Sequence, residues 1–132
     1  LRDSGYRALD ELKRDGTVSA IGIGVNEKAV LLDALKFADW DVFLLAGRYT
    51  LLEQEPLDDL LPECQRRGTS IVVGGPLNSG ILAGRDTWNY AKAPPEIADR
   101  VQKIGRVCDA HNVRCPQPRC NFNQQGIPHA MP

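Results

Sequence analysis

Hydrophobic residues recur at helical spacing in four segments of the chain. The first runs from Ser4 to Asp15 and is followed by Gly16, a natural helix terminator. Asn26 is a favourable N-cap for the second, and we expect it to begin that helix. The apolar stripe of this second segment consists of Val30, Leu31, Ala34, Leu35 and Ala38.

The third and fourth helical segments lie in the second half of the chain. Pro56 suits the first helical position of the third segment and Gly68 marks its end, while Pro62 lies inside it and is expected to distort it. The fourth segment follows Pro95. Its apolar side consists of Ile97, Val101, Ile104, Val107 and Cys108.

Three short apolar runs separate these helices and predict strands. They are Val18–Val25, Asp41–Ala46 and Ser70–Val73, and a long loop rich in Gly, Asn, Trp and Pro connects the last of them to Pro95. Strands that are apolar on both faces are typical of a parallel sheet covered by helices. The alternation predicts an α/β fold, although three strands do not distinguish an open doubly wound sheet from an arc of a barrel.

The pattern changes after Val113. Residues 114–132 lack periodicity and are dominated by proline and polar residues, so we predict a disordered tail after a first domain of residues 1–113. Codons can be chosen for Val113–Phe122 that, two bases out of frame, encode Ala-Leu-Pro-Ala-Ala-Ala-Leu-Gln-Phe. The tail is therefore also a candidate frame-shifted remnant, which the nucleotide sequence would show.

Composition gives no indication of a macromolecular partner. The chain has 16 basic and 17 acidic residues among 132 and no basic block, so neither nucleic acid nor an anionic membrane is expected to bind it. There is no apolar run of membrane-spanning length and no signal-peptide pattern. The spacing of the four cysteines and two histidines matches no common zinc site, and we predict no metal and a cytoplasmic, reducing location.

Candidate chemistry lies where the predicted strands end, because ligands of parallel α/β folds bind at the carboxyl ends of strands. Three stretches occupy such ends: Gly24–Asn26, Gly47–Tyr49 and Gly74–Gly80. None is a GxGxxG motif or a P-loop. Taken singly, each is as well explained by an ordinary strand-to-helix connection.

In this order and at these separations, the three stretches resemble the aldo-keto reductases, which are NAD(P)-dependent (β/α)₈ barrels. Gly16–Asn26 looks like the fifth barrel strand and its asparagine, Arg48–Leu52 like the turn after the sixth, and Gly75–Gly84 like the phosphate loop after the seventh. The resemblance covers residues 1 to about 113 and implies a partial TIM barrel of strands five to seven. It is strongest for the branch with L-fucose, D-threo-aldose and pyridoxal dehydrogenases.

The resemblance implies roles for six residues. Asn26 would hold the nicotinamide carboxamide, unless it only caps a helix, and the phosphate loop would contact the cofactor pyrophosphate through Gly75, Leu77 and Ser79. Arg48 and Tyr49 are candidates for contacting a polyhydroxylated substrate, with a surface pair on a loop as the alternative. The chain departs from many members of the family by having Gly74 in place of an aromatic residue and Ala46 in place of a glutamine.

No residue of the chain matches the family's catalytic aspartate, tyrosine, lysine and histidine, which the resemblance places on earlier strands. A complete barrel takes about 250 residues. We therefore expect a fragment, inactive by itself, of an enzyme that oxidises a sugar such as L-fucose or D-arabinose to its lactone, or a related aldehyde or alcohol, with NAD or NADP. The alternative is a non-catalytic α/β binding module.

Overall fold

The structure of the chain is a computed structural model that describes residues 5–113, and it divides into two compact units, with the boundary between Pro76 and Leu77. The predicted tail of residues 114–132 lies outside the described residues. The first unit holds a sheet with its helices, and the second holds a short hairpin and a long helix.

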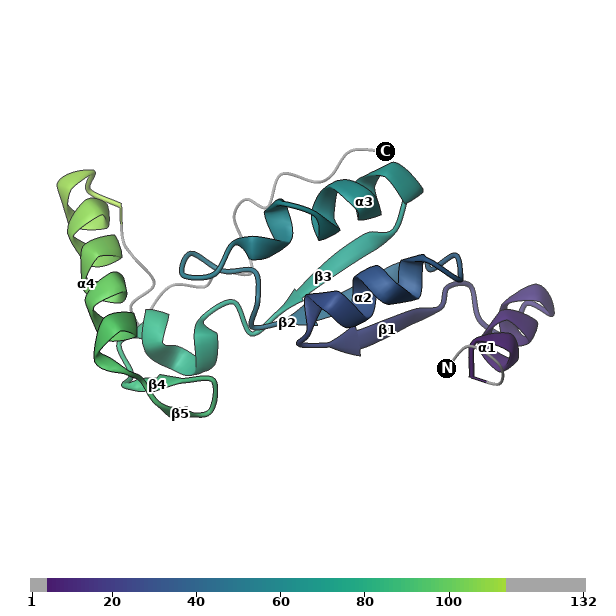
Figure 1. Cartoon of the computed structure of the whole chain (residues 1–132), viewed down its shortest axis with the longest axis horizontal. Helices are drawn as coiled ribbons and strands as arrows, with labels where there is room; N and C mark the ends of the chain where they lie inside the picture. Colours follow the sequence, from purple (N-terminus) through teal and green to yellow (C-terminus); the bar gives the residue numbers. More distant parts are fainter. Residues whose placement is uncertain (1–4, 114–132) are drawn as a thin grey trace. The chain divides into compact units, whose positions relative to one another are not determined.

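The sheet of the first unit has three parallel strands in the order β1-β2-β3 (Figure 1). Their bounds are Gly22–Val25, Val42–Ala46 and Ser70–Gly74. Gly24 lies opposite Leu44, which in turn lies opposite Val72. The predicted α/β class with a parallel sheet is thus confirmed, although the first strand begins four residues later than Val18 because only Gly22–Val25 pairs with β2.

Two crossover helices, α2 (Lys28–Leu35) and α3 (Leu60–Arg67), connect the strands and bury one hydrophobic core with them. The core centres on Phe43 and Leu45, both fully buried in β2. It also contains Ile21, Leu31, Ala34, Leu35, Trp40, Leu60 and Cys64. Sequential strands with both crossovers packed on one core are consistent with an arc of a (β/α)₈ barrel, in which every helix lies outside the strands.

The other face of the sheet is open to solvent. Leu44 is 43% exposed and Val72 is 48% exposed, although both stand in the middle of their strands. Side chains alternate between the two faces of a strand, so these residues point away from the core that Phe43 and Leu45 form. An exposed central apolar row is unusual in an independent domain, because apolar surface of this kind is normally buried.

Asn26 does not cap the second helix, and that prediction is wrong. The helix begins at Lys28, its N-cap is Glu27, and no side chain makes a capping hydrogen bond there. The reason is that β1 extends to Val25 and Asn26 lies in the bend that follows, one residue before the cap. The Asn26 side chain therefore remains at the edge of the sheet.

The third helical segment is divided in two. A 3₁₀ turn, η1 (Glu55–Leu57), contains Pro56, and α3 begins after Asp59, whose carboxylate accepts from the Leu60 N–H at 2.7 Å. Pro62 falls in the first turn of α3, where backbone N–H groups have no intrahelical partner, so it fits there without the distortion that we expected. Gly68 ends the helix as predicted, in a left-handed conformation with φ 73°.

The second unit replaces most of the predicted long loop with regular structure. It contains the 3₁₀ helix η2 (Asn78–Ala83), the two-stranded hairpin β4 (Thr87–Trp88) and β5 (Ala91–Lys92), and the predicted helix α4 (Pro95–Ala110). Elements of two residues are too short to give a periodic pattern, which is why the sequence did not reveal them. The predicted first helix is also present, as α1 (Gly5–Arg14) in the first unit.

Asp41 joins α1 to the sheet. Lys13 Nζ donates to both carboxylate oxygens of Asp41, at 2.6 and 2.7 Å, and the Ile21 N–H donates to one of them at 2.9 Å. The hydrogen bonds from Lys13 and then from Ile21 hold the pKa of Asp41 below its usual value. A carboxyl group whose pKa is lower in the folded state stabilises that state above its unfolded pKa, and the contribution is lost as pH falls through the folded pKa.

Asp41→Asn is therefore expected to reduce stability at pH 7 and to have less effect at pH 3, where the native carboxyl group is itself becoming protonated. Urea unfolding at the two pH values measures the difference. Asp33→Asn is the matched control, because its ion pair with Lys36 joins side chains that are 70% and 69% exposed. An Asp41→Asn penalty that is equal at both pH values would contradict this role.

Candidate functional site

The carboxyl ends of β1, β2 and β3 lie at one edge of the parallel sheet, and the predicted site residues of the first unit follow them (Figure 1). Asn26 follows β1, Arg48 and Tyr49 follow β2, and Gly75 follows β3. The Gly47 N–H donates to the Gly74 carbonyl at 2.7 Å, which extends the pairing of β2 with β3 to the carboxyl end of the strands. The topology thus gathers these predicted residues where a parallel fold binds ligands.

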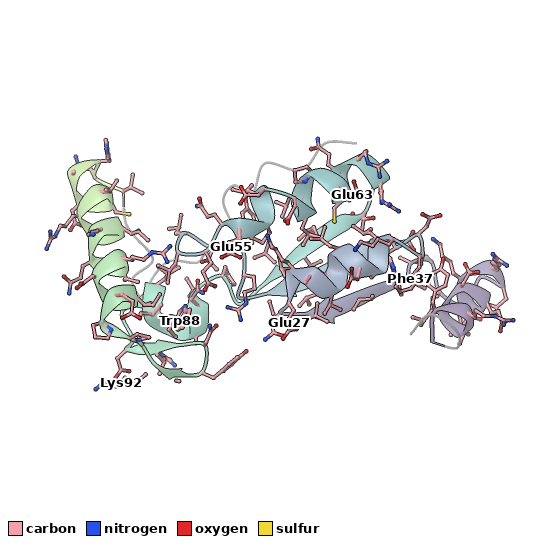
Figure 2. The ribbon with its side chains drawn as sticks, viewed as in Figure 1. Glu27, Phe37, Glu55, Glu63, Trp88 and Lys92 are labelled. Carbon is pink, nitrogen blue, oxygen red and sulfur yellow. The ribbon has the colours of Figure 1, made fainter. Side chains whose placement is uncertain are left out.

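Asn26 is exposed at this edge. With the amide nitrogen facing Glu27, it donates to the two carboxylate oxygens of Glu27 at 2.8 and 3.1 Å. Figure 2 labels Glu27 beside the start of α2. The amide is oriented by a neighbouring carboxylate rather than used for capping the helix.

Arg48 is held by two contacts within the first unit. Its Nε donates to the Asn26 carbonyl oxygen at 3.0 Å, and its guanidinium lies 3.5 Å from a Glu53 carboxylate oxygen. The segment containing Glu53 is itself fixed, because the Thr50 hydroxyl accepts from the N–H groups of Leu52 and Glu53, each at 3.0 Å. Arg48 therefore ties the end of β1 to the connection after β2.

Tyr49 has a half-buried ring that packs against the hydrophobic core of the first unit. Since its aromatic body is used in packing, the hydroxyl group is the part that remains for polar recognition. Of the two residues predicted to contact the substrate, Arg48 is thus already paired with Glu53, and Tyr49 is anchored through its ring.

The loop after β3 begins with two backbone N–H groups that bond to no acceptor within the described residues, those of Gly75 and Leu77. Gly75 is exposed and has a left-handed φ of 59°, which glycine adopts without the steric cost that a side chain brings. Leu77 begins the second unit, and its carbonyl oxygen accepts from the N–H groups of Gly80 and Leu82. Leu77 thus uses its carbonyl to order the loop and leaves its N–H available.

Ser79 is half-buried in η2 of the second unit and has a left-handed backbone, with φ 58° and ψ 16°. Its Oγ accepts from the Tyr90 N–H at 3.1 Å, and its carbonyl oxygen accepts from the Thr87 hydroxyl at 2.7 Å. Figure 2 labels Trp88 and Lys92 on the two strands of the hairpin that supplies both donors. The described contacts join Asn26 with Arg48, and Ser79 with the hairpin.

Sequence reasoning missed Thr87 and the backbone of Tyr90 as neighbours of Ser79. A glycine-containing two-residue turn is the usual hairpin signal, and the turn here is Asn89-Tyr90. Asn89 was the one available cue, because asparagine tolerates the left-handed conformation better than most residues.

Two further observations concern metal ions and membranes. Within residues 5–113, no cluster of three or more histidine, cysteine, aspartate or glutamate side chains is arranged to hold a metal ion. No helix in this part of the chain has both the length and the hydrophobicity needed to cross a membrane.

The parallel sheet and its crossover helices define the first unit as an α/β domain of the parallel class. Residues 2–122 match the model of the aldo/keto reductase family. The chain belongs to that family, as its strand-end motifs predicted.

Similar proteins include two dehydrogenases and a reductase. The chain is 45% identical over 116 residues to pyridoxal 4-dehydrogenase from Microbacterium luteolum, covering 85% of this chain and 34% of that protein. It is 37% identical over 127 residues to D-threo-aldose 1-dehydrogenase from a Pseudomonas species, covering 92% of this chain and 39% of that protein. NADH-specific methylglyoxal reductase from Escherichia coli K12 is 30% identical over 82 residues, covering 62% of this chain and 24% of that protein.

The chain thus spans between a third and two-fifths of the length of the first two relatives. A comparison with solved structures found no match. The comparisons support the predicted oxidoreductase family and the predicted similarity to sugar and pyridoxal dehydrogenases.

Proposed function

We propose that this chain forms the part of an NAD(P)-dependent dehydrogenase that contacts the nicotinamide and the pyrophosphate of the cofactor, as strands five to seven of a (β/α)₈ barrel. In this proposal the catalytic groups belong to other strands. The intact enzyme oxidises a small sugar such as L-fucose or D-arabinose, or a related aldehyde or alcohol. We also predict a cytoplasmic location, with either NAD or NADP as the cofactor.

The observation that carries the proposal is the set of hydrogen-bond donors on alternate residues after β3. The N–H groups of Gly75 and Leu77 bond to no acceptor within the described residues, and the Ser79 hydroxyl still has its proton to donate. Phosphate oxygens are acceptors and bind well to backbone N–H groups and hydroxyls. Each of these donors therefore suits an oxygen atom of a pyrophosphate.

Asn26 supports the nicotinamide end of the proposal. Its side chain is not used for capping and lies at the carboxyl edge of the sheet. A carboxamide ligand needs both a donor and an acceptor, and an asparagine amide supplies both. Arg48 and Tyr49, anchored at the same edge, are proposed to border the substrate, with Arg48 also holding the Asn26 backbone in place.

The isolated chain is expected to show no dehydrogenase turnover. Hydride transfer needs a side chain that acts as general acid or base, and no residue of the chain matches the family's catalytic residues. Incubation with L-fucose and NAD⁺ or NADP⁺, followed by the absorbance of the reduced cofactor, tests this expectation. A relative such as the Microbacterium enzyme, assayed with pyridoxal, controls for cofactor quality. Substrate-dependent reduction by the isolated chain would contradict the proposed division of roles.

A further inference from the structure

The hairpin of the second unit is bonded to Ser79 at two points. The Thr87 hydroxyl donates to the Ser79 carbonyl oxygen at 2.7 Å, and the Tyr90 N–H donates to Ser79 Oγ at 3.1 Å. One bond fixes the backbone of Ser79 and the other fixes its side chain. The residue is thus restrained in both its position and its rotamer.

Ser79 needs this support because its conformation is unfavourable for a residue with a side chain. Its φ of 58° follows that of Asn78 at 47° and precedes that of Gly80 at 101°, so three successive residues are left-handed. Left-handed conformations at non-glycine positions persist only where the surrounding structure holds them. The Thr87 bond to the Ser79 carbonyl is one such restraint.

The hydrogen bond from Tyr90 also decides what Ser79 can offer a ligand. A serine hydroxyl has one proton to donate and two lone pairs that accept. Because the Tyr90 N–H occupies a lone pair, the hydroxyl proton is left to donate to an acceptor outside the chain. A hydroxyl group that donates suits a phosphate oxygen, because the phosphate oxygen is an acceptor.

The backbone of Tyr90, and not its ring, makes this contact. The Tyr90 side chain is 91% exposed, so packing of the ring does not set the conformation. Asn89 and Tyr90 have φ values of 47° and 65°, the pattern of a type I′ hairpin turn, in which glycine is favoured at the second position. The hairpin thus places the N–H of a strained residue against Ser79 Oγ.

We infer that Thr87 and the backbone N–H of Tyr90 are positioning groups that hold Ser79 ready to bind the cofactor pyrophosphate. The inference rests on the proposed function, since it takes Ser79 to be a phosphate ligand. It adds that the hairpin β4–β5 is part of the cofactor site, through hydrogen bonds that do not themselves touch the cofactor.

NMR titrations of the 132-residue chain with NADP⁺, and in parallel with NAD⁺, test the inference. Thr87→Val keeps the shape of the side chain and removes the donor, and is expected to weaken binding roughly three- to tenfold. Thr87→Ser restores the hydroxyl and is expected to restore the affinity. Tyr90→Gly keeps the N–H and suits the turn better, so it is expected to bind at least as tightly as the original chain.

Ser79→Ala separates failure of this inference from failure of the proposed function. If Ser79→Ala leaves the affinity unchanged, Ser79 is not a phosphate ligand and the proposed function loses this contact. If the original chain binds neither dinucleotide, the proposed function itself is contradicted and the inference falls with it. If Ser79→Ala weakens binding and Thr87→Val does not, the positioning role alone is overturned. Lost affinity in Tyr90→Gly would assign the contact to the ring and overturn the role of the backbone.

The spectrum of each variant also reports whether the second unit is folded. If Thr87→Val unfolds that unit, the affinities of Thr87→Ser and Tyr90→Gly, each compared with that of the original chain, still test the inference. Both variants keep the donors that the inference invokes, so reduced affinity in either folded variant would contradict it.

Discussion

Phe43→Ala is expected to lower the free energy of unfolding of the isolated chain by about 3–5 kcal/mol, the usual cost of removing a buried aromatic side chain. Phe43 is fully buried in β2, and its ring centroid lies 6.2 Å from that of Trp40. A small unit with one layer of helices has little stability to spare. Urea unfolding followed by circular dichroism is expected to show a strongly weakened or absent transition.

Leu44→Ala is the matched control, one residue further along the same strand. Leu44 is 43% exposed on the uncovered face, so its truncation is expected to cost about 1 kcal/mol or less. Similar penalties for the two variants would show that the open face is buried in solution, for example by self-association. Sedimentation of both variants would detect that association.

Gly22→Ala is expected to cost about 3 kcal/mol, the upper part of the range for overpacked sites. A Cβ atom at Gly22 would overlap the carbonyl oxygen of Val42, on the neighbouring strand. The clash is with backbone, so no side-chain rotation relieves it, and the start of the β1–β2 pairing must open. The same unfolding assay measures the loss.

Gly24→Ala provides the contrast within the same strand. There the nearest atom to an added Cβ would be Leu44 Cβ at 3.6 Å, an ordinary van der Waals separation. The alanine also restricts the unfolded chain, so we expect a neutral or slightly stabilising effect. Equal destabilisation by both alanines would mean that β1 does not pair with β2 in the register described.

The sequence predicted most of the first unit because its elements are long enough to show a period. The apolar stripe of α2 and the runs of β2 and β3 gave their type and order, and Gly68 gave the end of α3. Three features became visible only in the structure: the bend at Asn26, the break in the third helical segment before Asp59, and the packing of helices on only one face of the sheet. The first two depend on where a strand or turn happens to end, which local patterns determine poorly.

For the candidate site, the sequence predicted which residues stand at the strand ends, through their resemblance to a known family. It did not predict what those side chains already contact. The pairing of Arg48 with Glu53 and the bonds from the hairpin to Ser79 arise from tertiary placement of short, aperiodic segments. Such contacts leave no repeat in the sequence from which to predict them.

A chimera tests the central claim most directly. The segment of the Microbacterium pyridoxal 4-dehydrogenase that matches this chain would be replaced by the corresponding residues of the chain, and cofactor reduction with pyridoxal measured. If the chain is an arc of an aldo/keto reductase barrel that carries cofactor contacts, the chimera is expected to fold and to reduce the cofactor, with a raised KM for the cofactor after Ser79→Ala. A folded chimera that binds no cofactor would contradict the account.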